Sequence, residues 1–135
     1  NHGFRSFTGG NLLLDESGAP NIGPFFCGGL ITVDSVTGEL SYSGQYRAFS
    51  HFAPVVTRGA SVYPCKVYDS AVTGTAFYQA ASMACDATAV KDKNGVFSLF
   101  FVNPAQEKKQ IMLKHGKKTV YFEALPDSLT TLQIE

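Results

Sequence analysis

Residues 92–103 read DKNGVFSLFFVN, and this stretch decides the class of fold. Its first four residues are a turn signal, because an Asn-Gly pair such as Asn94-Gly95 suits the type I′ turn of a tight β-hairpin. The run at residues 96–103 is the most apolar in the chain and has the length of one strand. We therefore predict a hairpin whose second strand lies at the centre of a sheet.

Short apolar runs bounded by turns continue on both sides of this hairpin. Further strands are predicted at residues 12–14, 30–33, 39–42, 61–68, 76–81, 82–90, 111–114, 119–124 and 128–134. Strands that recur about every 8–12 residues are typical of a sandwich or barrel. The sequence thus predicts an all-β fold, an antiparallel β-sandwich of about 7–9 short strands with one short helix.

One segment departs from the β pattern. Apolar side chains recur there at helical spacing, at Tyr46, Phe49, Phe52, Ala53 and Val56. Ser43 is a suitable N-cap, and Pro54 is expected to end the helix. The spacing predicts one helix over residues 44–53.

Length and charge exclude several classes of protein. The chain has 135 residues, whereas a (β/α)8 barrel needs about 200 or more. The formal net charge is zero, which gives no support for a nucleic-acid partner. No apolar run approaches the ~18–20 residues of a membrane-spanning helix. The hydrophobic fraction of 44% and the charged fraction of 16% favour a packed domain over disorder.

Cys27, Cys65 and Cys85 allow at most one internal disulfide. We interpret them as small buried hydrophobic residues, with a Cys65–Cys85 bridge in a secreted protein as the alternative. Their spacing does not suggest a metal site, and we predict no metal and no cofactor.

Few residues are arranged for catalysis. Asp15 and Glu16 are adjacent carboxylates, but sequence neighbours seldom converge on one substrate, so we expect loop hydrogen bonds. Ser50 and His51 are consecutive, and their side chains diverge on a helix. We therefore assign no catalytic residue.

Two surface features allow binding. One is a basic cluster, which consists of Lys108, Lys109, Lys114, Lys117 and Lys118. We interpret it mainly as the solvated edge of a hairpin, and a phosphate-binding patch is the alternative. Exposed aromatic rings could form a sugar-stacking platform, with Tyr63, Tyr68, Tyr78 and Tyr121 as candidates.

Residues 11–21, NLLLDESGAPN, resemble the WNLxLDxxGGPN segment of glycoside hydrolase family 30, which includes glucosylceramidases and endo-β-1,6-glucanases. Residues 43–52, SGQYRAFSHF, are similar to the YxxxxHFS helix of that family. Residues 125–132, LPDSLTTL, resemble its closing LPxxSxxTF strand. The family tryptophan before the asparagine is Gly10 here, and a family glycine is Ala19, so one sugar-stacking ring is lost.

The resemblance implies a domain organisation. In the family a (β/α)8 barrel carries the chemistry, and a β-sandwich is fused to its side. Residues 1–27 would be a barrel-exit segment that packs on the sandwich, and residues 28–135 would be the sandwich domain. The family is retaining, and both of its catalytic glutamates lie upstream of any segment present here, so none is carried over.

The predicted function is a non-catalytic accessory β-sandwich of a family 30-like glycosidase, buttressing a (β/α)8 catalytic domain absent from this chain. The parent would be a retaining enzyme of glucosylceramidase or β-glucanase type, in an extracellular, secreted or lysosomal-like location. One alternative is an autonomous carbohydrate-binding module for a neutral glycan. Another is a structural or interaction sandwich that self-associates without a sugar ligand.

The accessory-domain hypothesis makes a structural prediction. An apolar patch around residues 12–14, Phe25, Phe26 and the helix should be exposed in the isolated chain, because a partner domain would cover it.

Overall fold

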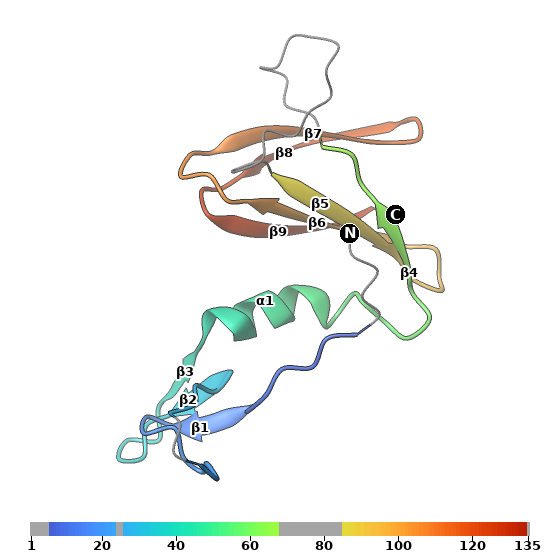
Figure 1. Ribbon diagram of the computed structural model, residues 1–135. Helices are drawn as coiled ribbons and strands as arrows, with labels where there is room; N and C mark the ends of the chain where they lie inside the picture. The colour runs from blue at the N-terminus through green and yellow to red at the C-terminus, as the bar shows by residue number, and fades with distance from the viewer. Residues whose placement is uncertain (1–5, 24–25, 68–84, 135) are drawn as a thin grey trace. The chain divides into compact units, whose positions relative to one another are not determined.

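The computed structural model describes residues 6–23, 26–67 and 85–134, and it divides the chain into two compact units (Figure 1). The first unit is Asn1–Pro54 and the second is Val55–Glu135. The sequence predicts a domain boundary at residue 28. That boundary stays a prediction, because the two compact units do not test it. The strand predicted at residues 76–81, together with Phe25, Tyr68 and Tyr78, lies outside the described residues.

The first unit contains a three-stranded sheet in the order β1-β2-β3. Its strands are β1 (Leu13–Asp15), β2 (Ile31–Val33) and β3 (Leu40–Tyr42). β2 and β3 are antiparallel, as predicted, whereas β1 runs parallel to β2, with Leu13 opposite Ile31. The antiparallel prediction is therefore corrected for this one pair of strands.

The predicted helix follows β3 as α1 (Gly44–Phe52). The Ser43 hydroxyl accepts a hydrogen bond from the Tyr46 backbone N–H at 3.1 Å, which confirms the N-cap. Ala53 is the C-cap, so the helix ends one residue before the predicted end, and Pro54 follows. The helix has no buried residue, although the rings of Phe49 and Phe7 lie 5.4 Å apart.

The second unit is a two-layer antiparallel sandwich. One layer is a sheet in the order β4-β5-β6-β9, formed by β4 (Ser61–Pro64), β5 (Asp86–Lys91), β6 (Phe97–Asn103) and β9 (Ser128–Ile134). The other layer is the hairpin of β7 (Lys109–His115) and β8 (Lys118–Ala124), stacked over that sheet in Figure 1. β6 lies between β5 and β9, so the predicted central strand is confirmed. The all-β class and the strand number are confirmed as well, because the described residues contain nine strands and one helix.

The core of the second unit lies between its two layers. Leu99 and Phe101 are two residues apart on β6, so their side chains point to the same side of the sheet. Both are almost fully buried there. Phe122 of β8 meets Phe101 edge to face, with ring centroids 5.6 Å apart. This contact joins the hairpin to the four-stranded sheet.

Asn103, the last residue of β6, is a fully buried polar side chain. Its amide nitrogen donates to the carbonyls of Glu107 at 2.9 Å and Leu125 at 2.7 Å. Its amide oxygen accepts from the Ala105 N–H at 3.2 Å. The side chain therefore connects the end of β6 to the turn before β7 and to the segment after β8.

The turn between β5 and β6 differs from the predicted type. Among the non-glycine residues described, only Asn11 and Asp127 have a positive φ, so Asn94 does not adopt the type I′ conformation. The Asp92 carboxylate instead accepts hydrogen bonds from the N–H groups of Asn94 and Val96. Within this turn only Gly95 has a positive φ, of 92°. The aspartate therefore organises a longer turn.

The buried amide can be tested by substitution. Asn103→Ala should lower the free energy of unfolding by about 1–3 kcal/mol, because it leaves carbonyls without their donor in the packed interior. Urea unfolding measures the loss. Gln106→Ala, an exposed change in the same turn, is the matched control, and an equal loss there would contradict the assigned role.

Candidate functional site: an exposed apolar surface and a pocket

The first unit exposes large apolar side chains that a stable domain would normally bury. We call them the apolar surface; its members are Phe7, Leu12, Leu13, Ile22, Phe26, Leu40, Tyr42 and Phe52. Leu12 is 66% exposed and Phe26 is 77% exposed. Where such side chains lie next to one another, they mark sites of contact with other proteins.

The predicted exposure is confirmed for Leu12, Leu13 and Phe26 and, on the helix, for Phe52, whereas Phe49 is half-buried. It is wrong for Leu14, which is only 3% exposed, because neighbouring residues of a strand point to opposite faces. Strands in parallel sheets are usually covered on both faces. β1 covers one face with Leu14 inward and leaves Leu13 exposed on the other, so this strand lacks half of its usual cover.

The loop after β1 is held by the two predicted acidic residues. The Asp15 carboxylate accepts from the Ser17 hydroxyl at 2.6 Å and from the Ala19 N–H at 2.7 Å, and the Ser17 hydroxyl is the main cause that lowers the pKa of Asp15. Glu16 accepts from the N–H of Ser35 at 2.9 Å. The loop hydrogen bonding predicted for this pair is confirmed.

Gly18 lies inside the same loop and cannot be replaced without strain. Its φ is 84°, in the left-handed region that favours glycine. A Cβ at this position would lie 2.7 Å from the carbonyl oxygen of Cys27. The loop therefore depends on a glycine at this point.

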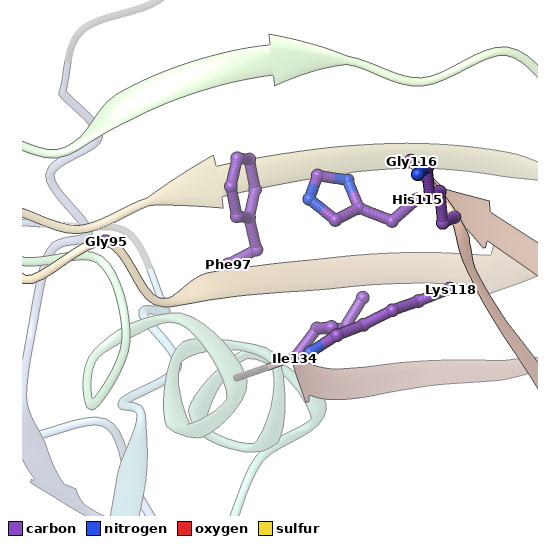
Figure 2. A pocket seen from close by; sticks show the side chains of 7 residues that line it. Gly95, Phe97, His115, Gly116, Lys118 and Ile134 are labelled. Carbon is purple, nitrogen blue, oxygen red and sulfur yellow. The ribbon is translucent and has the colours of Figure 1, made fainter.

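The second unit carries a pocket of about 410 Å³ at one end of the sandwich (Figure 2). It forms where the tips of two hairpins meet the end of β9, and its lining residues are Gly95, Phe97, His115, Gly116, Lys117, Lys118 and Ile134.

Aromatic rings form one wall of this pocket. Figure 2 shows Phe97 and His115 side by side, and their tilted rings have centroids 4.4 Å apart. Tyr63 packs on Phe97 at 5.4 Å. The Lys91 ammonium lies 5.1 Å from the centre of the Phe97 ring, in a cation–π contact.

The basic cluster divides into two parts. Lys108 forms an ion pair with Glu123 at 2.9 Å and Lys109 pairs with Glu107; the Lys108 contact is the main cause that lowers the pKa of Glu123. Lys117 and Lys118 lie at the other end of the hairpin and line the pocket. Sequence reasoning identified these lysines but missed Phe97, His115 and Ile134. Only two residues separate His115 from Lys118, which could have indicated that a tight hairpin turn brings them together.

The predicted tyrosine platform is not assembled among the described residues. Tyr63 belongs to β4 and packs on Phe97, whereas Tyr121 belongs to β8, is 74% exposed and pairs across the hairpin with Met112. Tyr68 and Tyr78 lie outside the described residues. The two rings that can be placed therefore belong to different surfaces.

The remaining candidates are structural in the described part of the chain. Ser50 donates its hydroxyl to the Arg47 carbonyl at 2.6 Å rather than to His51. Cys27, Cys65 and Cys85 are half-buried, no disulfide joins Cys65 to Cys85, and burial raises the pKa of the Cys65 thiol. Within residues 6–23, 26–67 and 85–134, the acidic, histidine and cysteine side chains form no group able to hold a metal ion.

Comparisons with known proteins place the fold. No family model and no curated protein matches the chain. Solved structures with a similar fold include SrfJ from Salmonella typhimurium, with a TM-score of 0.75, and the endo-β1,6-glucanase BT3312, with a TM-score of 0.74. Each match covers 91% of this chain, with 21% sequence identity.

This chain spans only 25% of the length of either structure. The likeness confirms, at the level of fold, the resemblance identified in residues 11–21, 43–52 and 125–132. Among the residues that the structure describes, no helix is long and apolar enough to cross a membrane.

The apolar surface should make the isolated chain self-associate and bind an apolar fluorescent dye. Leu12→Ser combined with Phe26→Ser should weaken association by about tenfold or more, because each large apolar side chain contributes about 1.5–3 kcal/mol when buried. Light scattering measures the effect. Met112→Ser combined with Tyr121→Ser removes exposed apolar side chains of the second unit as a control, and an equal effect there would contradict the assignment.

The Asp15 loop should make stability depend on pH. Because folding lowers the pKa of this carboxyl, its contribution is present above the ordinary value of 3.8 and is lost as the pH falls through the folded value. Asp15→Asn should therefore lower the melting temperature at neutral pH, and the difference from the parent chain should shrink in acid. A difference that stays constant over the whole pH range would refute this origin.

Proposed function

We propose that this chain is the accessory β-sandwich region of a family 30-like glycosidase whose (β/α)8 catalytic domain is encoded outside this sequence. One observation carries the proposal: 91% of this chain matches the fold of a larger endo-β1,6-glucanase, but only 25% of that enzyme is covered. The motif at residues 11–21, which resembles the barrel-exit segment of the family, supports it independently.

The apolar surface of the first unit would be the docking face for the catalytic domain. Interfaces between domains of one chain cover about 600–1,500 Å², and each Å² of apolar surface removed from water contributes about 25 cal/mol. Leu12, Leu13 and Phe26 would lose their contact with water in the complete enzyme. The region would thereby stabilise the barrel and fix the position of its last strand.

Chemistry would be left to the barrel. Retaining hydrolysis needs two carboxyl groups about 5–5.5 Å apart, on either side of the scissile bond. Asp15 and Glu16 instead accept hydrogen bonds within their own loop and from Ser35. We propose a β-glucan as the substrate of the parent enzyme. We also propose an extracellular location, because such a polymer would be degraded outside the cell.

The coding sequence upstream of Asn1 gives the first test. It should encode a (β/α)8 pattern with glutamates at the ends of two strands. The complete enzyme should hydrolyse a β-glucan, and the 135-residue chain alone should not. An upstream sequence without such a pattern would overturn the proposal.

The docking face gives the second test, in the complete enzyme. Leu13→Asp should lower the melting temperature by several degrees, because it places a charge in a covered interface. Tyr121→Asp, at an exposed ring of the second unit, is the matched control and should change it little. Equal melting temperatures for Leu13→Asp and the parent enzyme would show that another surface is used.

A further inference from the structure

We propose that the pocket of the second unit binds a sugar unit that carries a carboxylate or sulfate group. This is a binding activity beyond the support of a catalytic domain. The residues that line the pocket give it an apolar wall and a positive charge, which favour a ligand that has an apolar face and a negative charge. The choice of a saccharide, rather than another anion with an apolar face, rests on the proposed function.

The wall of the pocket offers an apolar platform that is already in place. Phe97 starts the central strand β6 and is held between His115 at 4.4 Å and Tyr63 at 5.4 Å. Ile134 lines the same space from β9, as Figure 2 shows. Apolar side chains fixed by their neighbours can pack against the C–H groups of a sugar ring at little cost in side-chain entropy.

The charged side chains that line the pocket, Lys117 and Lys118, are both positive. Lys117 lines the pocket, and the Lys91 ammonium lies over the Phe97 ring beside Gly95. Lys118 also lines the pocket and has an interaction of its own, and the Lys91 ammonium is engaged over the Phe97 ring, so we assign recognition of the anion to Lys117. The described lining contains no acidic residue, although the chain as a whole has a net charge of zero.

The turn at the hairpin tip holds Lys117 near the platform. His115 pairs with Lys118 across β7 and β8, which leaves only Gly116 and Lys117 in the loop. Gly116 has a φ of 59°, and a glycine with positive φ in the first loop position is the signature of a type II′ hairpin. The backbone at Lys117 is therefore fixed, and its ammonium can form a charge-assisted hydrogen bond with a carboxylate or sulfate.

Calorimetric titration of the full chain tests the proposal with three probes: a galacturonic acid trisaccharide, the neutral trisaccharide of β1,6-linked glucose, and sodium sulfate. The acidic trisaccharide should bind best, and added salt should weaken its binding, because exposed charges are screened. Lys117→Gln should weaken it by roughly threefold to tenfold. Lys114→Gln, in the same hairpin but outside the pocket lining, is the matched control and should have little effect.

The other outcomes overturn the proposal. Equal binding of the neutral trisaccharide would show that charge is not read. Equal binding of sulfate alone would show that the ring platform is not used, and an equal effect of the Lys114 and Lys117 variants would place the anion elsewhere. Because the titration needs no catalytic domain, its result is independent of whether an upstream barrel exists.

Discussion

The sandwich of the second unit depends on one buried amide. Asn103 ends the central strand, and its side chain bonds to the carbonyls of Glu107 and Leu125 and to the N–H of Ala105. Three backbone segments therefore meet at a single residue that has no contact with water. Because a buried polar group is costly unless all of its hydrogen bonds are made, this geometry fixes where the hairpin of β7 and β8 lies over the four-stranded sheet.

The first unit is stabilised in a different way. Leu14 is its only large side chain that is fully buried among the described residues, and the backbone is held mainly by polar contacts such as those of Asp15 and Ser43. A compact unit with so little apolar core and so much exposed apolar surface is incomplete by the usual balance of folding. The two units thus differ: one has its own apolar core, and the other leaves most of its large apolar side chains exposed.

The sequence predicted most elements but not the way they meet. The helix and its Ser43 cap follow from local rules, and the long apolar run before Asn103 marked the central strand. The Asn94-Gly95 pair misled, because the Asp92 carboxylate competes for the same N–H groups. The parallel direction of β1 could not be predicted, because a strand of three residues carries no signal about its partner. The pocket was missed because its residues come from three separate chain segments that only strand register brings together.

The glycine in the loop after β1 changes how the family resemblance should be valued. Gly18 and Asp15 both belong to the motif through which the chain resembles a glycosidase family, and both are required by the backbone itself. Such a motif can persist for reasons of folding alone, whatever residue stands beside it at Gly10. Its presence is therefore evidence of a shared fold, and it carries no information about a substrate.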